Sequence, residues 1–357
     1  MLLGYALSPF GHEPDSWRQA PDDRLLGFEA LVEQVSAADA AGLAFVLLAD
    51  RLGLRPVDDV SPTAVPFEPT LLASALATRV GRIGMIAAAA TTQHEPYNLA
   101  RRFASLDLIS KGRGGWLVVA DGGHHDRDGE FVDVVTALWD SFEDDAFVYD
   151  KTAGRFFDPL KMHVAHHKGA YFTVRGPLNV NRSPQGRPVL AHLLDDADSA
   201  LAIRTGELLL LQARSADDLV AAAKRIGKAI NAAGRKRDDI RLVASISPVI
   251  CSAGQGAEKT SAFSDIDQTV EPPFAARLAG TPSAIVEQLK DLEATADLDG
   301  FTVFPPTLEM GQRFLSEVVP ELRRQGLMDA GSGTTLRERL GLPRQEHPSL
   351  VGKEASR

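Results

Sequence analysis

The chain has 357 residues, of which 44% are hydrophobic and 24% charged, and its 48 acidic and 38 basic residues give a net charge of −10. This composition is typical of a folded globular protein and excludes a disordered or fibrous chain. No stretch gathers lysine and arginine among aromatic residues, so no nucleic-acid partner is expected. No apolar run approaches the ~20 residues that cross a bilayer, so no membrane association is expected either.

The single cysteine, Cys251, excludes a disulfide within the chain. The first residues lack the basic segment, apolar segment and small-residue cleavage site of a secretory signal. Both observations predict a cytoplasmic protein.

Apolar runs of strand length alternate with longer segments of helical period, which is typical of a parallel sheet with crossover helices. Helices are predicted at residues 24–41, 69–78, 96–110, 128–142, 196–205, 216–233, 282–296 and 308–325. Strands are predicted at residues 2–8, 43–49, 82–89, 115–120, 188–192, 207–212, 240–249 and 300–304. Eight such units indicate a (β/α)8 TIM barrel. A doubly wound sheet is the main alternative, but no Gly-x-Gly-x-x-Gly follows the first strand.

Two segments interrupt the alternation. Residues 149–187 are rich in glycine and proline and are interpreted as an inserted capping segment between units four and five, and residues 252–279 are interpreted as a polar loop. We therefore predict one TIM-barrel domain over residues 1–330 and a short C-terminal tail over residues 331–357. The obvious apolar anchors of that tail are Leu336, Leu340 and Leu342.

The predicted helix over residues 96–110 carries one apolar stripe. Leu99, Phe103, Leu106 and Ile109 follow one another at three or four residues. We expect all four side chains to face the barrel wall.

Polar residues that follow the strands are the candidates for chemistry, because the active site of a TIM barrel lies at the carboxyl ends of its strands. His12 follows the first strand, just after Phe10, and Asp50 and His94 follow the second and third. We expect His12, Asp50 and His94 to line one cavity. His12 can equally be read as a surface histidine, and Asp50 as a cap or a partner of Arg51.

Several histidines lie close together in the sequence, but their spacing does not favour a metal site. The adjacent His124 and His125 point in opposite directions on an extended loop. His163, His166 and His167 fit neither an i,i+4 helical pair nor a zinc finger. No metal is predicted.

Residues 94–116, with the sequence HEPYNLARRFASLDLISKGRGGW, closely resemble a signature of the bacterial luciferase-like monooxygenases. The resemblance is to the branch that holds nitrilotriacetate monooxygenase component A, dibenzothiophene-sulfone monooxygenase and long-chain alkane monooxygenase. Further matches occur in the same order over nearly the whole chain, at residues 66–69, 138–141, 154–157, 175–188 and 333–337.

This resemblance implies a TIM barrel, often a homodimer, in which FMNH2 from a separate flavin reductase reacts with O2 and a small organic substrate is oxygenated. His12 lies where relatives place a histidine near the substrate, so it is the catalytic candidate, with Phe10 and His94 in the substrate pocket. The positions that correspond to the flavin site are Asp50, Ala90, Thr91, Leu117, Asp121, Asp195 and Asp196.

The departures from the family pattern gather at that flavin site. Relatives read Gly-Trp-Asn-Val-Val-Thr-Ser where this chain has residues 115–121, and Gln-Ala-Gly-Ser-Ser where it has residues 192–196. Small hydroxyl and backbone donors, which suit a phosphate, are thereby replaced with Leu194, Asp195 and Asp196. Inserts that cover the pocket in relatives are also short here, which predicts a more open mouth. We expect FMN to bind weakly or not at all.

Two functions remain open on this evidence. One is a monooxygenase with a remodelled flavin pocket, and the other is a degenerate homologue without flavin that serves as a binding protein or as the partner of an active subunit. Hydride transfer with a deazaflavin, which distant relatives use, has no specific support in these residues.

Overall fold

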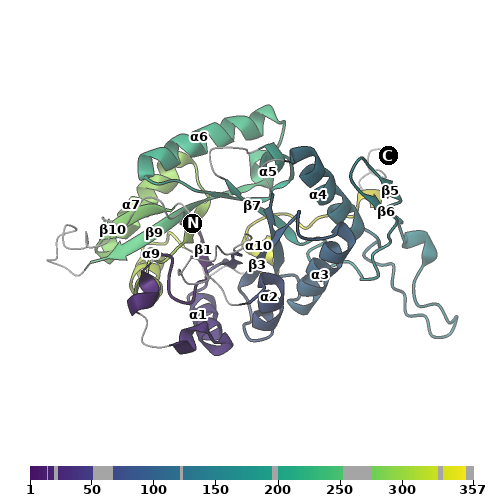
Figure 1. Ribbon diagram of the computed structural model, residues 1–357, viewed down its shortest axis with the longest axis horizontal. Coiled ribbons are helices and arrows are strands. Elements are labelled where there is room, and N and C mark those ends of the chain that lie inside the picture. The colour runs from purple at the N-terminus through teal and green to yellow at the C-terminus, as the bar shows by residue number, and fades with distance from the viewer. Residues whose placement is uncertain are drawn as a thin grey trace, which may run out of the picture.

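The computed structural model describes residues 1–13, 15–19, 23–50, 67–120, 124–194, 200–251, 275–328 and 333–350. Its central element is a closed barrel of parallel strands, in which each strand pairs with the next and β9 closes the ring onto β8 (Figure 1). The barrel strands are β1 (Leu2–Ala6), β2 (Phe45–Leu48), β3 (Gly84–Ala90), β4 (Gly114–Val119), β7 (Val189–Leu194), β8 (Leu208–Leu211), β9 (Arg241–Ile250) and β11 (Gly300–Val303). The predicted TIM barrel is confirmed, and the doubly wound alternative is excluded.

Helices surround this barrel (Figure 1). Proline opens α2, α3 and α7, where its missing N–H costs nothing, and the side chains of Ser215 and Thr281 cap α6 and α7. The helices are α1 (Phe28–Ala40), α2 (Pro69–Ala77), α3 (Pro96–Ile109), α4 (His125–Trp139), α5 (Ala200–Thr205), α6 (Ala216–Ala232), α7 (Pro282–Ala296), α8 (Leu308–Arg313), α9 (Val319–Arg324) and α10 (Leu336–Arg339). No helix in the described ranges is long and apolar enough to cross a membrane.

The apolar stripe of α3 is confirmed at Leu99, Phe103 and Leu106, which are at most 1% exposed, but the prediction for Ile109 is wrong. Ile109 is 49% exposed. At about 100° per residue, Ile109 lies about 80° around the helix from Leu99, outside the stripe that the other three form. Spacing by threes drifts off a buried face unless a step of four corrects it.

The region interpreted as a loop over residues 252–279 ends in a strand that the sequence did not reveal. This strand, β10 (Ala276–Gly280), pairs in parallel with the second half of β9, from Ile246 to Ile250. The first half of β9 pairs with β11 through Val243 to Ile246. The strand β9 is therefore long enough to serve the barrel and then continue beyond it.

The side chains of the barrel strands divide into two clusters because successive residues of a strand point to opposite faces. The outer cluster packs against the helices and includes Trp116, whose indole N–H donates to the Ala89 carbonyl at 3.0 Å. The inner cluster fills the barrel and consists mainly of Ala6, Phe45, Leu47, Ile86, Ala88, Leu117, Val189, Ala191, Leu208, Leu210, Val243 and Phe304.

The C-terminal tail closes the amino-terminal end of the barrel. Leu336, Leu340 and Leu342 belong to the inner cluster. A Cβ on Gly84 would lie 2.4 Å from Leu336 Cδ1, so α10 approaches β3 closely at this point. The three apolar anchors of the tail are therefore part of the barrel core.

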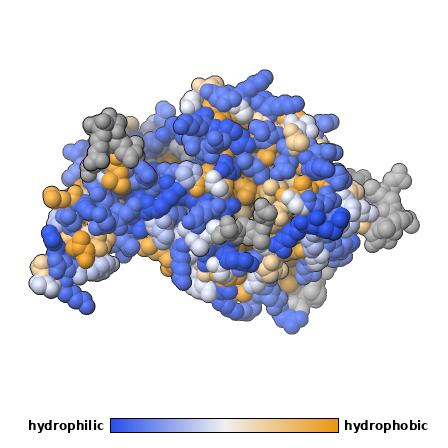
Figure 2. Space-filling model, turned by 180° about the vertical axis from the view of Figure 1, so that it is seen from behind, coloured by the Kyte–Doolittle hydropathy of each residue, from blue (hydrophilic) through white to orange (hydrophobic). Residues whose placement is uncertain are grey.

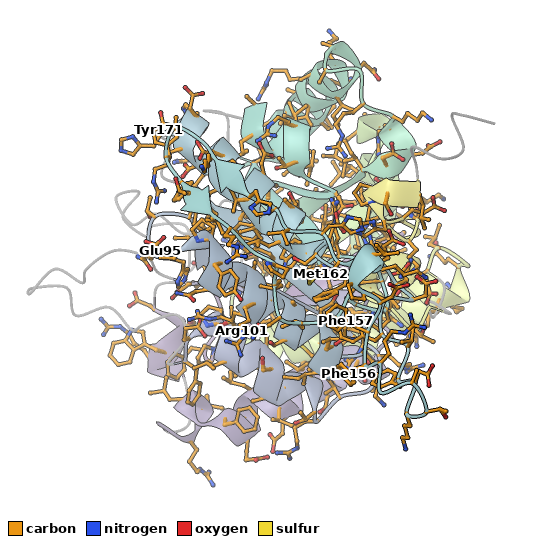
Figure 3. All side chains as sticks on the ribbon, turned by 90° about the vertical axis from the view of Figure 1, so that its right-hand side faces the viewer. Glu95, Arg101, Phe156, Phe157, Met162 and Tyr171 are labelled. Atoms are coloured by element: carbon orange, nitrogen blue, oxygen red, sulfur yellow. The ribbon has the colours of Figure 1, made fainter. Side chains whose placement is uncertain are left out.

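The segment between β4 and β7 runs outside the barrel along α4. It contains the short hairpin of β5 (His167–Lys168) and β6 (Thr173–Val174), which lies beside α4 in Figure 1. Glu130 of α4 accepts hydrogen bonds from the backbone N–H groups of Tyr171 and Phe172 at 3.0 and 2.8 Å. Figure 3 views this side of the molecule and shows Tyr171 at one edge and Phe156 and Phe157 toward the other.

The surface is mainly hydrophilic in the view of Figure 2, with apolar side chains in scattered groups. Some of the most exposed apolar side chains come from the segment along α4. Tyr149 is 61% exposed, Phe156 60% and Leu160 89%. Tyr149 and Phe156 contact each other edge to face at 5.0 Å between ring centroids.

Candidate active site at the barrel mouth

The loop after β1 is fixed to the loop after β11 by backbone hydrogen bonds. The N–H groups of His12 and Glu13 donate to the carbonyls of Pro305 and Pro306 at 2.9 and 3.1 Å. Gly11 has a φ of 107°, and a Cβ there would lie 2.4 Å from the Pro306 oxygen. Glycine is therefore required at this close approach, which sets His12 at the carboxyl end of the barrel.

The imidazole of His12 is held in one orientation over the inner cluster. Its Nε2 lies 3.1 Å from the Ala6 carbonyl, and its ring meets the ring of Phe304 edge-on at 5.0 Å. A carbonyl only accepts, so Nε2 carries the proton and Nδ1 carries the lone pair. Burial lowers the pKa of His12 to about 4, although the Ala6 bond opposes the shift. At neutral pH His12 is therefore an uncharged acceptor.

Asp50 and His94 lie near each other at the ends of β2 and β3. Burial and the positive charge of Arg102 lower the pKa of His94, whereas the charges of Glu68 and Asp50 raise it. Glu68 also caps α2 and forms an ion pair with Arg102 at 3.1 Å. The structure thus groups Asp50 and His94 within one cluster of charges.

The predicted meeting of His12 with Asp50 and His94 stays a prediction. The contacts given above for His12 come from Ala6 of β1 and from the chain just after β11. The charges that act on His94 come instead from the end of β2, from the start of α2 and from α3. Phe10 is half-buried in the same loop as His12. All of these residues follow barrel strands, so they lie around the same carboxyl end of the barrel, which we call the mouth.

Thr91 points away from the barrel interior. It is fully buried, its hydroxyl donates to Asp128 Oδ1 at 2.6 Å, and its carbonyl accepts from Arg127 at 3.3 Å. Its hydroxyl therefore ties the end of β3 to α4. Ala90 and Leu117 are 2% and 1% exposed, and both add only apolar surface. The remaining three expected flavin contacts, Asp121, Asp195 and Asp196, lie outside the described residues.

Two hydroxyl groups inside the barrel escaped the sequence analysis. Ser245 and Thr302 are fully buried register partners on β9 and β11, and neither hydroxyl has a hydrogen-bond partner within the described ranges. Val243 and Phe304 belong to the inner cluster, so Ser245 and Thr302, two residues away, also face inward. The sequence does place both hydroxyl residues within the predicted strands 240–249 and 300–304, at positions that face inward.

The described wall suits the apolar part of a flavin better than its polar part. The small or apolar side chains of Ala88, Ala90 and Leu117 offer a ribityl chain or phosphate no donors from β3 and β4. The inner-facing hydroxyls of Ser245 on β9 and Thr302 on β11 lie two residues before the level of Phe304, which follows β11. The positions that correspond to a flavin phosphate loop, Asp195 and Asp196, lie outside the described residues, and the described inner wall supplies no phosphate donors of its own.

Comparison with known proteins now places the fold and the mouth in a family. Residues 10–263 match the luciferase-like monooxygenase family. N-acetyl-S-(2-succino)cysteine monooxygenase from Bacillus subtilis is 31% identical to this chain, over 95% of the chain and 96% of that protein. Nitrilotriacetate monooxygenase component A from Aminobacter aminovorans is 29% identical, over 97% of each.

A solved structure shares both the fold and part of the sequence. The crystal structure of riboflavin lyase, with modified FMN and its substrate riboflavin, has a TM-score of 0.84 and 27% identity, over 98% of this chain and 99% of that one. The chain belongs to the luciferase-like monooxygenase family, and the resemblance to the nitrilotriacetate monooxygenase branch is confirmed.

Proposed function

We propose that this chain is a monooxygenase that uses FMNH2 and O2 to oxygenate a small organic substrate, within a pocket more apolar than its relatives have. The observation that carries the proposal is the state of His12 at the mouth. It is uncharged, oriented by the Ala6 carbonyl and in contact with Phe304 of the inner cluster. Membership of a monooxygenase family supports the reaction class, and a relative that is component A of its enzyme supports a separate reductase.

In this proposal the protein binds and orients, and the flavin supplies the oxygen chemistry when bound. Nδ1 of His12 accepts a hydrogen bond or a proton from a polar group of the substrate. A pKa of about 4 makes His12 a weak base but keeps it uncharged throughout the neutral range. The apolar inner wall excludes water from the reacting groups and favours a substrate with a substantial apolar part.

The test is a coupled assay of the wild-type chain with a flavin reductase, NADH, FMN and O2. Thioethers, tertiary amines and alkyl carboxylates are supplied as substrates, and oxygenated products are detected by mass spectrometry. We expect His12→Ala to lower turnover roughly 100-fold or more, which is typical of a lost acid-base group, with little change in unfolding free energy. Unchanged turnover of the variant at saturating flavin would remove His12 from the mechanism.

A flavin-free partner subunit is the second candidate, and the apolar wall of Ala88, Ala90 and Leu117 favours it. Its expected result is no product with any substrate and no binding of FMN or FMNH2 in anaerobic titrations. Binding of FMNH2 without product would instead support a flavin enzyme and show that none of the tested compounds is its substrate.

A further inference from the structure

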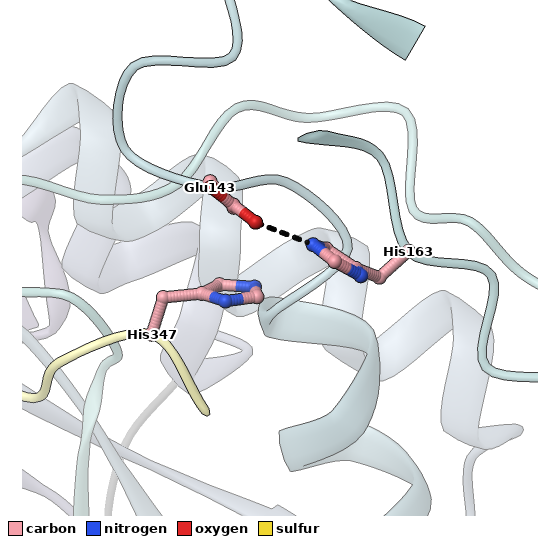
Figure 4. Close-up of side chains that lie close together, drawn as sticks. All are labelled: Glu143, His163 and His347. Carbon is pink, nitrogen blue, oxygen red and sulfur yellow. Dashed lines mark hydrogen bonds and ion pairs between the residues drawn. The ribbon is translucent and has the colours of Figure 1, made fainter. Parts of the chain in front are cut away.

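Three residues from distant parts of the chain meet on the outside of the barrel. Glu143 lies just after α4, His163 lies in the segment along α4, and His347 lies in the C-terminal tail. One carboxylate oxygen of Glu143 and one ring nitrogen of each histidine lie within 4.8 Å of one another. Figure 4 shows the three side chains turned toward a common centre.

The backbone fixes the position of each of these side chains. The N–H of Glu143 donates to the Lys161 carbonyl at 3.0 Å, and the N–H of His163 donates to the Ser141 carbonyl at 2.7 Å. The ring of His347 donates from Nε2 to the Asp140 carbonyl at 2.9 Å. Because a carbonyl cannot donate, this bond leaves the lone pair of His347 on Nδ1. A backbone carbonyl on the far nitrogen is the usual way in which a metal-binding histidine is oriented.

We propose that Glu143, His163 and His347 bind one divalent transition-metal ion of the zinc class. Two imidazoles and one carboxylate are a donor set that suits Zn²⁺. In a tetrahedral site with bonds of about 2.0 to 2.1 Å, ligand atoms are about 3.3 Å apart. His163 Nε2 and Glu143 Oε1 already lie 3.0 Å apart, and the other ligand atoms, within 4.8 Å of one another, must close by up to about 1.5 Å around an ion.

The hydroxyl of Ser349 holds this cluster together without an ion. It lies 2.8 Å from Glu143 Oε1 and 2.8 Å from His347 Nδ1. Rotation of this short side chain would free Glu143 Oε1, and an ion would also have to displace the Ser349 backbone N–H, which donates to His347 Nδ1 at 3.2 Å. The same three residues can thus form a hydrogen-bonded cluster or a metal site.

The fourth position of the ion faces an open groove of about 550 Å³. The groove is lined by His163, His347 and Ser349 together with Asp140, Arg187 and residues of α4. Water can enter there and complete a tetrahedral set, as it does in metal sites with three protein ligands. The groove lies beside α4, and its lining residues do not include those of the barrel mouth, so this site is independent of the proposed oxygenation.

An ion at this place would connect the segment along α4 to the C-terminal tail. These two parts of the chain already contact each other through Arg182, which donates to the Gln345 carbonyl at 2.8 Å. Metal bonds between Glu143, His163 and His347 would add a second connection and stabilise the packing of the tail. Binding would raise the melting temperature without requiring flavin or substrate.

The experiment uses the full chain, freed of metal by a chelator and titrated with ZnCl2 by calorimetry. We expect one equivalent to bind at micromolar concentration or tighter, and Co²⁺ to give the intense visible absorption of a tetrahedral site. At 100 times the dissociation constant, Zn²⁺ should raise the melting temperature by about 3 to 4 °C.

Variants decide whether the three residues are the ligands. His163→Ala and His347→Gln should each weaken Zn²⁺ binding roughly 100-fold or more. His166→Asn is the matched control, because His166 is exposed on the same segment, and asparagine tolerates its φ of 46°. Circular dichroism of each metal-free variant establishes that it folds. Absence of one-to-one binding to the wild type, or binding that survives in both His163→Ala and His347→Gln, would overturn the proposal.

Discussion

The inside of the barrel and the seam between the tail and the rest of the molecule are built on opposite principles. The inner cluster is apolar, and its described hydroxyls, Ser245 and Thr302, have no partner within the described ranges. The seam is dense with paired charges. The 1%-exposed side chain of Arg182 binds Asp140 and Asp144, and Arg337 binds both carboxylate oxygens of Glu207 at 2.7 and 2.8 Å.

The two regions therefore differ in how specifically their interactions fix the structure. Apolar packing stabilises the closed barrel, because burying any apolar side chain of suitable volume is favourable. Ion pairs instead select one arrangement, since a buried charge without its partner is costly. The chain therefore uses apolar residues where it needs a cavity wall and charged residues where a distant segment must dock in one register.

The first way to test the comparison is a cavity in the apolar part. Phe103→Ala should lower the free energy of unfolding by about 3 to 5 kcal/mol, because the ring is fully buried and packs 5.8 Å from the ring of Trp116. Ile109→Ala on the same helix is the control and should cost less than about 1 kcal/mol, since Ile109 is half exposed. Chemical denaturation measures both. Similar losses in the two variants would contradict the division of α3 into buried and exposed faces.

The second test breaks the seam. Arg337→Met should destabilise the fold by about 3 kcal/mol, at the lower end of what a broken buried pair costs. The loss is limited because Glu207 keeps the donors Gln345 Nε2 at 2.9 Å and the Leu190 N–H at 3.1 Å. Adding Glu207→Gln should recover part of the loss, because it removes the stranded charge. If the double variant is as unstable as the sum of the two single variants, the charges are not coupled.

These two regions were not equally visible in the sequence. The barrel strands were predicted within about two residues at each end and the helices α1 and α4 within about four, because buried strands and helix stripes follow fixed periods. The strand β10 was missed, since Ala276–Gly280 is short, is marked by no strong apolar pattern and gains its pairing only from β9. The resemblance covered Arg337 and Arg182, but nothing in local spacing paired them with Glu207, Asp140 or Asp144.

The cluster of Glu143, His163 and His347 likewise shows what local sequence spacing cannot predict. The spacing of His163, His166 and His167 argued against a metal held by those three, and of them only His163 joins the cluster. A site formed by Glu143, His163 and His347 spans 204 positions of the chain, and only the folded tail brings its members together. Local spacing therefore could not reveal it. The orientation of His12 by the Ala6 carbonyl was equally invisible, because a backbone partner leaves no mark in the sequence.

The third test uses pH on the barrel wall. Burial, assisted by Arg204 and Arg235, lowers the pKa of His192 to about 3, and its Nε2 lies 2.9 Å from the Thr205 hydroxyl. Below pH 6.5 the unfolded chain binds a proton that the folded chain excludes, so stability falls as pH falls toward 3. Between pH 6.5 and 5 the loss from this group should be about 2 kcal/mol. His192→Gln should flatten the pH dependence of stability in this window, and an unchanged slope would show that His192 does not titrate so low.

The smallest expected effect is on flavin affinity at the barrel mouth, which the sequence departures from the family pattern are expected to lower. In the sequence, Asp195 and Asp196 follow β7, at positions where the family resemblance implies small hydroxyl residues. A carboxylate ~4 Å from a phosphate costs up to about 4 kcal/mol at an effective dielectric constant of ~20, and half of that weakens binding roughly thirtyfold. Lost hydrogen bonds at positions such as Leu117 add ~0.5 to 1.5 kcal/mol each.

The corresponding gain-of-binding variant combines Leu194→Gly, Asp195→Ser and Asp196→Ser with Leu117→Asn. FMN affinity, measured by quenching of flavin fluorescence, should rise roughly tenfold to thirtyfold over the wild type. Leu117 and Leu194 are both buried, so a double variant, Asp195→Ser with Asp196→Ser, separates the phosphate effect from any loss of packing. Micromolar binding by the wild type would show that the carboxylates do not oppose the phosphate. If both variants fold and still ignore FMN, the missing donors are not the cause, and the short cover of the pocket becomes the better explanation.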